Sequence, residues 1–345
     1  MNVHAGVPSP AVQPLSALPQ ADYVAITPYL LPPGTPKKVN VGDGFILDSA
    51  VKLVGARPHT LISSRAPLTE ADIERINASK CVLVIGANTL KDDYELAPGF
   101  TLETLGRLKV PVVLMGVGHY GVPEVTRGLK PNSVNLFRAM LERFPFMSVR
   151  CDASRDYVLA ALPDKADAVL MTSCPVVHPV DGIDAGFARK EPYQQVVVTI
   201  TDRAFLQEQL ALLPAAKALF PAKRRILALH QDYQNAPLWK FANDQGFEIF
   251  RDDAYEPFIA LYAATDMHFG NRVHAHLKCL SLGVPSFCTP FDLRQTYFAQ
   301  SLDYPLISNG SAPELASYDF GRAVARRTAA RQTMDRFVSA LRNIL

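Results

Sequence analysis

The sequence lacks three features that would assign it to a specialised class of protein. It has no run of about eighteen apolar residues that could span a membrane. Its charges nearly cancel at a formal net charge of +2, without the strongly basic face typical of nucleic-acid binding. Its five cysteines are scattered and never spaced as C-x-x-C, which disfavours a disulfide framework and a structural zinc site. We therefore expect a globular cytoplasmic protein with no nucleic-acid partner.

The opening residues also lack the basic segment and the continuous apolar segment of a secretory signal. They hold several prolines instead, and we expect residues 1–20 to form a flexible N-terminal arm. The chain of 345 residues is long enough for two domains beyond this arm.

Short apolar runs alternate with segments of helical period along most of the chain. Runs such as CVLVIG and VPVVLMG are almost continuously hydrophobic, as in parallel strands buried on both faces. The alternation lapses at residues 179–194, where prolines and glycines indicate a linker, and then restarts. This pattern predicts two Rossmann-like, doubly wound α/β domains, at residues 21–178 and 195–310.

Residues 311–345 predict a C-terminal helical tail of one long helix or two, with apolar residues at helical spacing and repeated arginines. We expect this tail to dock on a core and to turn its arginines to solvent. The alternative is that the Arg-rich tail makes peripheral contact with an anionic membrane or a polyanionic substrate.

Ligands of open parallel sheets bind beyond the carboxyl ends of the strands. In the first domain, polar and glycine-rich segments follow the predicted strands, but none has the G-x-G-x-x-G spacing and acidic residue of a dinucleotide site. Helix capping and ordinary turns remain alternatives for these segments. The candidate residues are Asn40, Gly42, Asp43, Gly86, Asn88, Gly118, His119 and His178.

The second domain places cationic side chains at its strand ends. Arg203 follows the first strand at a helix start, where a guanidinium suits a carboxylate or phosphate; a surface salt bridge is the alternative. His230 ends the next strand and either faces the cleft or caps the strand. Arg272 and His274 follow a later strand and should lie in the first turn of a helix, where an anion is favoured.

His268, His274 and His276 stand close together in the sequence, which raises the question of a metal. The H-E-x-x-H pattern and clustered carboxylates are lacking, so we expect no metal site. The alternative for all three is a role as hydrogen-bonded core or surface groups.

Together these segments resemble the polysaccharide pyruvyl transferase family. The signature near the C-terminus of that family is an aspartate, R-x-H, G-x-P and aromatic-Asp-x-Lys. The N-x-G-D element, the glycine loops and the V-R and C-P elements also follow in order between residues 40 and 294. Arg294 replaces the usual lysine, Asn271 a commoner serine, and Asn88 a more frequent glycine. The matching residues are Asn40, Gly42, Asp43, Gly86, Gly116, Gly118, Val149, Arg150, Cys174, Pro175, Asp266, Arg272, His274, Gly283, Pro285, Phe291 and Asp292.

The resemblance implies a GT-B-like arrangement in which the two domains face a cleft, with the acceptor on the N-terminal side and the donor on the C-terminal side. It implies transfer of pyruvate from phosphoenolpyruvate, as co-substrate and without a further cofactor, to two hydroxyls of a sugar. The acceptor would be a cell-surface glycan or a lipid-linked saccharide precursor, which places the enzyme in the cytoplasm or at the inner membrane face.

The resemblance also implies residue roles. Donor binding falls to Arg203, Arg272, Arg294, His230 and Asn271. His274, with Arg272, is the catalytic candidate, because a histidine can give and take a proton near its ordinary pKa of about 6.5. His230 and His178 are the alternatives for this proton transfer.

Two other functions stay open. A GT-B glycosyltransferase that uses a nucleotide sugar would want a glutamate for the donor ribose, and Glu256 is the nearby candidate, although helix capping explains it equally well. A non-catalytic glycan- or anion-binding relative would bind without turnover.

Overall fold

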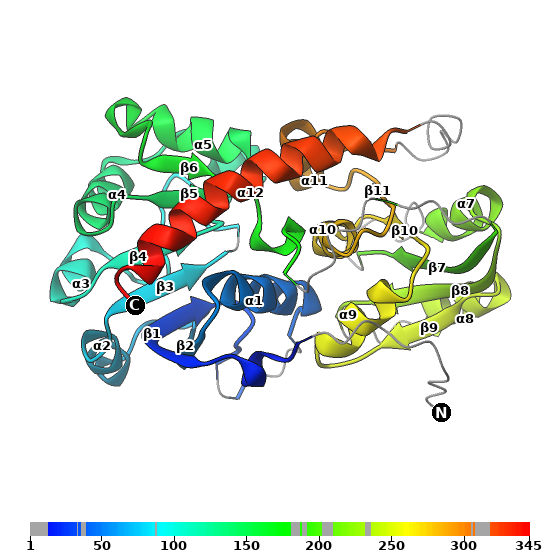
Figure 1. The fold of residues 1–345 in the computed structure, drawn as a ribbon, viewed down its shortest axis with the longest axis horizontal. Coiled ribbons are helices and arrows are strands. Elements are labelled where there is room, and N and C mark those ends of the chain that lie inside the picture. Colours follow the sequence, from blue (N-terminus) through cyan, green and yellow to red (C-terminus); the bar gives the residue numbers. More distant parts are fainter. Residues whose placement is uncertain are drawn as a thin grey trace.

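The computed structural model describes residues 13–32, 34–35, 39–86, 88–180, 187, 192–201, 210–231, 236–304, 306–307 and 318–345. Much of the predicted arm and linker, the start of the predicted tail and Arg203 lie outside these ranges. The described residues form two α/β lobes side by side, and one long helix crosses from the C-terminal lobe to the N-terminal lobe (Figure 1). The predicted fold class, two doubly wound domains with a C-terminal helix, is confirmed.

The sheet of the N-terminal lobe is parallel, with the strand order β2-β1-β3-β4. A parallel pair, β5 and β6, adjoins it through a bridge between Val117 and Val149. All residues of β3 are buried, as expected for a strand covered on both faces. The strands are β1 (Gln20–Thr27), β2 (Arg57–Ser63), β3 (Cys81–Ile85), β4 (Val112–Met115), β5 (Met147–Val149) and β6 (Val169–Met171). The helices are η1 (Leu15–Ala17), α1 (Val41–Val54), α2 (Glu70–Asn77), α3 (Leu102–Arg107), η2 (Pro123–Val125), α4 (Pro131–Arg143), α5 (Asp152–Leu159), η3 (Pro163–Lys165) and η4 (Pro175–Val177).

The sheet of the C-terminal lobe is also parallel, with the order β11-β10-β7-β8-β9. Its strands are β7 (Tyr193–Thr199), β8 (Ala222–Leu229), β9 (Glu248–Arg251), β10 (Met267–Gly270) and β11 (Ser286–Cys288). The helices are α7 (Leu212–Leu219), α8 (Ala236–Asp244), α9 (Glu256–Ala263), α10 (Val273–Ser281), α11 (Leu293–Leu302) and α12 (Phe320–Arg342).

Helix α1 lies between the lobes and packs against both (Figure 1). Asn40 caps its start by accepting a hydrogen bond from the Gly42 N–H at 3.2 Å. The Val41 N–H donates to the His230 carbonyl of the other lobe at 3.1 Å. The Phe45 ring packs edge-on against the His230 ring, with centroids 5.5 Å apart. This shared apolar core fixes how the loops of the two lobes face each other.

Helix α12 docks on the protein, and one of its arginines, Arg327, is buried rather than turned to solvent. Arg342 donates to the Leu53 and Val54 carbonyls at the end of α1, each at 2.8 Å. Arg327 is 5% exposed and donates to the Leu280 carbonyl in the last turn of α10 at 2.7 Å. Carbonyls at a helix C-terminus have no partner in their own helix and favour a cation. The expectation of arginines turned to solvent is therefore wrong for Arg327, whereas Arg322, Arg326, Arg336 and Arg342 are exposed as expected. In the described ranges no helix is both long enough and apolar enough to cross a membrane.

Candidate active site between the lobes

The strand order identifies where a ligand should bind. In the N-terminal lobe, β2 is added on one side of β1 and the later strands β3 and β4 on the other, so the strand order switches between β1 and β3. In the C-terminal lobe the strand order switches in the same way between β7 and β10. Such switch points leave a crevice beyond the carboxyl ends of the strands. In this protein the two crevices face each other and form one pocket.

The pocket has a volume of about 300 Å³ and is lined by loops that follow strands of both lobes. Its polar lining contains two arginines, one aspartate, two histidines and several amides. The lining residues are Asn40, Gly42, Asn88, Tyr120, Gly121, Val122, Thr201, His230, Gln231, Asn271, Arg272, Val273, His274, Phe291, Asp292, Arg294 and Gln295.

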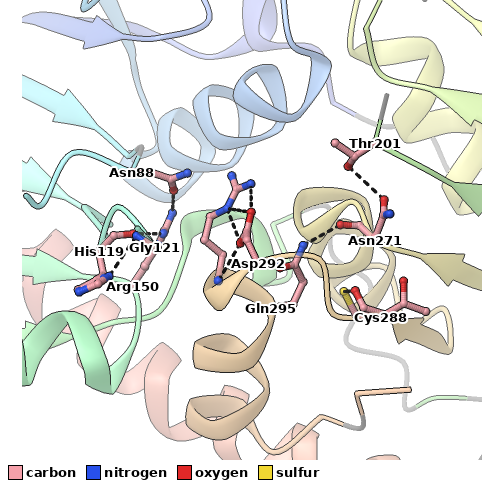
Figure 2. Close-up of polar contacts among 11 residues, drawn as sticks. Asn88, His119, Gly121, Arg150, Thr201, Asn271, Cys288, Asp292 and Gln295 are labelled. Carbon is pink, nitrogen blue, oxygen red and sulfur yellow. Dashed lines mark hydrogen bonds and ion pairs between the residues drawn. The ribbon is translucent and has the colours of Figure 1, made fainter. Parts of the chain in front are cut away.

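Asn271 connects the loops of the C-terminal lobe at the floor of this pocket. Its side-chain oxygen accepts from the Thr201 hydroxyl at 3.1 Å, and its carbonyl accepts from Gln295 at 2.8 Å (Figure 2). The preceding Gly270 has φ +151°, and a Cβ there would lie 2.0 Å from the Thr199 carbonyl oxygen. Only glycine tolerates this backbone conformation beside Thr199, at the point where the chain leaves β10 for α10.

Arg272 and Arg294 supply the positive charge of the pocket. Arg272 is the N-cap of α10 and donates to the Ile200 carbonyl at 3.1 Å and to Gln231 at 3.3 Å. Arg294 forms an ion pair with Asp292, with Nε 2.8 Å from both carboxylate oxygens. Burial raises the pKa of Asp292, but hydrogen bonds and charge from Arg294 outweigh burial and lower it. The helix start and the guanidinium groups together favour an anionic ligand.

His274 lies in the first turn of α10, lines the pocket and is 9% exposed. Its Nε2 is buried and has no hydrogen-bond partner. Burial lowers its pKa to about 3, and the guanidinium groups of Arg150, Arg294 and Arg272 add to this effect. In the ligand-free protein the ring is therefore neutral at pH 7 and is a proton acceptor, whereas the sequence suggested titration near neutral pH.

Arg150 is a component of the site that the sequence analysis did not select. It is 2% exposed, donates to the His119 carbonyl at 2.7 Å and hydrogen-bonds the Asn88 side chain (Figure 2). Its guanidinium lies over the Phe298 ring at 5.4 Å, and its Nε has no hydrogen-bond partner. Burial lowers its pKa. The V-R element of the family resemblance was the available signal for this residue, which holds pocket loops and adds positive charge behind them.

Four candidates of the N-terminal lobe do not line the pocket and instead pack behind it: Asp43, Gly86, Gly118 and His119. Asp43 forms an ion pair with Arg65 at 2.7 Å. A Cβ on Gly86 would lie 2.5 Å from the Ile46 side chain, so this glycine allows its loop to pack on α1. Gly118 lies against Arg150, and the His119 ring packs edge-on against Tyr157 and Tyr297, each at 5.2 Å. Asn40, Gly42 and Asn88 do line the pocket.

The two alternative histidines are held in structural roles. His230 lines the pocket, but its Nε2 hydrogen-bonds the Tyr262 hydroxyl, and its ring packs on Phe258 at 5.1 Å. Burial lowers the pKa of His230 well below its ordinary value. His178 is fully buried outside the pocket, where its Nε2 contacts the Thr172 carbonyl at 2.8 Å, and burial lowers its pKa to about 4. In the described part of the chain, no group of three or more His, Cys, Asp or Glu side chains is placed to hold a metal ion.

The fold places this chain among the two-lobed, GT-B-like proteins. A Listeria monocytogenes protein described as a UDP-N-acetylglucosamine 2-epimerase matches with a TM-score of 0.51 and 11% identity, over 93% of this chain and 96% of that one. The S. aureus MnaA–UDP co-structure matches with a TM-score of 0.49 and 10% identity, over 94% and 98% of the two chains. The Neisseria meningitidis UDP-GlcNAc 2-epimerase bound to UDP-GlcNAc matches with a TM-score of 0.48 and 11% identity, over 90% and 93%. At such low identity the Listeria comparison shows a shared fold alone.

The family is defined by the sequence. Residues 40–292 match the family model of polysaccharide pyruvyl transferases, and the chain belongs to this family. The matched segment runs from the Asn40 cap of α1 to Asp292 and so includes most of the pocket. The resemblance noted from the sequence is confirmed. A comparison with the curated proteins finds no match.

Proposed function

We propose that this protein transfers the pyruvyl group of phosphoenolpyruvate to two hydroxyls of a sugar in a cell-surface glycan or its precursor, and so forms a ketal. The observation that carries the proposal is that Arg272, Arg294 and His274 all line one pocket, and that the buried Nε2 of His274 has no hydrogen-bond partner. Phosphoenolpyruvate carries a carboxylate and a phosphate, and two guanidinium groups at helix starts suit these two anions.

His274 moves the proton in this mechanism. As a neutral base it takes the proton of a sugar hydroxyl, and it delivers a proton to C3 of the donor, which becomes a methyl group. The hydroxyl oxygen bonds to C2, which has oxocarbenium character, and the bond between C2 and the phosphate oxygen breaks. The second hydroxyl then closes the ketal, and its proton leaves with the phosphate. Arg272 and Arg294 stabilise the charge that develops on the departing phosphate.

The dimensions of the pocket favour a small donor over a nucleotide sugar. Ligand pockets span roughly 300–1,000 Å³, and this pocket, at about 300 Å³, is at the lower end. Glu256, the candidate for a donor ribose, is exposed at the start of α9 and does not line the pocket. These features favour pyruvyl transfer over glycosyl transfer.

The test is to incubate the protein with phosphoenolpyruvate and a cell-wall or capsule glycan, and to measure phosphate release together with pyruvylated product by mass spectrometry. His274→Ala should lose turnover and keep its circular dichroism spectrum. Consumption of a nucleotide sugar in place of phosphoenolpyruvate would overturn the proposal, as would full activity of His274→Ala. Binding of the glycan without any product would support the non-catalytic alternative.

A further inference from the structure

An exposed apolar segment lies at the mouth of the pocket. We call residues 120–125 the rim segment. Six large hydrophobic side chains are exposed among the described residues, and three of them lie in this segment: Tyr120 at 44%, Val122 at 39% and Val125 at 38%. Tyr120 and Val122 also line the pocket. Clustered apolar side chains that remain uncovered beside a pocket indicate a binding surface.

Hydrogen bonds hold the backbone of the rim segment in place. The Tyr120 N–H donates to the Leu90 carbonyl at 2.9 Å, and the Asp92 N–H donates to the Val125 carbonyl at 2.9 Å. The Gly121 N–H donates to His119 Nδ1 at 3.1 Å (Figure 2). The Tyr120 ring is therefore presented to solvent by an ordered backbone, which lowers the entropic cost of binding a ligand on it.

The rim segment also adjoins the donor side of the pocket. A Cβ added to Gly121 would lie 3.3 Å from Cγ of Arg294, so this segment of the N-terminal lobe contacts a cationic residue of the C-terminal lobe. A ligand on Tyr120 would thus lie beside the group that we assign to the donor phosphate or carboxylate.

We propose that the rim segment is the acceptor subsite, where a pyranose ring of the glycan stacks its C–H face on the Tyr120 ring and directs two hydroxyls toward His274. The face of an aromatic ring is electron-rich and attracts the slightly positive hydrogens of the sugar face. Val122 and Val125 extend the apolar surface for the neighbouring sugar. This inference rests on the proposed function and adds the residues that select the acceptor.

The test separates acceptor binding from donor binding in steady-state kinetics. Tyr120→Ala should raise the KM for the glycan about three- to tenfold, the effect of losing one aromatic contact, and leave the KM for phosphoenolpyruvate unchanged. Tyr120→Phe and Tyr120→Trp should stay close to the wild type, because they keep a ring. Leu102→Ala is the matched control, because Leu102 is 47% exposed on α3 and does not line this pocket. An unchanged acceptor KM in Tyr120→Ala would overturn the inference.

A binding measurement keeps this inference separate from the proposed function. Methyl β-galactopyranoside and methyl β-glucopyranoside serve as probes in saturation-transfer difference NMR, which needs no turnover. Tyr120→Ala should lose the transfer to the sugar C–H protons that the wild type and Leu102→Ala show. Equal transfer in the wild type and Tyr120→Ala, or no transfer in either, overturns the stacking. Failure of the wild type to make ketal from phosphoenolpyruvate would instead overturn the proposed function.

Discussion

The protonation state of His274 gives the most detailed prediction. A pKa held at about 3 in place of 6.5 corresponds to about 5 kcal/mol against charging the ring. Part of this penalty comes from three guanidinium groups, and the negative charge of bound phosphoenolpyruvate would offset them. Donor binding should therefore raise the pKa of His274 toward its ordinary value and take up part of a proton from solvent near pH 7.

Two measurements follow this proton. Nitrogen-15 NMR should show the His274 ring neutral from pH 5 to 9 without donor and partly charged near pH 7 with donor, with His274→Asn used to assign the resonance. Calorimetry in buffers of different ionisation enthalpy should show proton uptake in the wild type that His274→Asn lacks. A ring already charged at pH 7 without donor, or equal uptake in both proteins, would refute the reasoning.

Three further predictions concern packing and stability. Gly42→Ala should lower kcat/KM by about tenfold or more, because the added Cβ would lie 2.9 Å from Nδ1 of His274 and displace its ring. Gly106→Ala is the control and should keep full activity, because the added Cβ would lie in open space. Asp48→Asn should lower the free energy of unfolding, measured in urea, by about 3 kcal/mol, because the buried Asp48 carboxylate of α1 lies 3.6 Å from the buried ammonium of Lys278. A loss of less than about 1 kcal/mol would contradict this prediction. Thermal stability should fall as the pH drops from about 6.5 toward 4, because histidines of the unfolded chain bind protons in this window and the buried, neutral histidines of the folded chain do not. Each such histidine should lower the free energy of unfolding by on the order of 3 kcal/mol across this window. An unchanged melting temperature between about pH 7 and 5 would contradict this prediction. The histidines with pKa values lowered to about 3 or 4 are His178, His268 and His274.

Much of the fold could be predicted from the sequence because its signals are local. The hydrophobic run of β3 determines a strand within a few residues. The sequence also predicts helix α1, but with Asp43 as its cap, whereas the helix begins at Val41 and is capped by Asn40. The strand-end rule likewise led to Arg272 and His274, since β10 and the start of α10 are adjacent in sequence.

The remaining parts of the site depend on contacts between distant residues. Arg150 acquires its role from Asn88, which is 62 positions away, and from burial that no single segment encodes. His230 looked like a candidate proton carrier, but Tyr262 and the apolar lobe interface hold it in place. Arg327 has the pattern of a solvated tail residue in the sequence, but it is buried and donates to the Leu280 carbonyl, 47 positions away.

The central claim is that the pyruvyl carbon of phosphoenolpyruvate becomes a ketal carbon on the glycan. The most direct measurement is carbon-13 NMR of the glycan after reaction with donor labelled at C2. We predict a labelled quaternary carbon bonded to two sugar oxygens, formed in step with phosphate and absent with His274→Ala. Label that stays in phosphoenolpyruvate, or that appears only in free pyruvate, would contradict it.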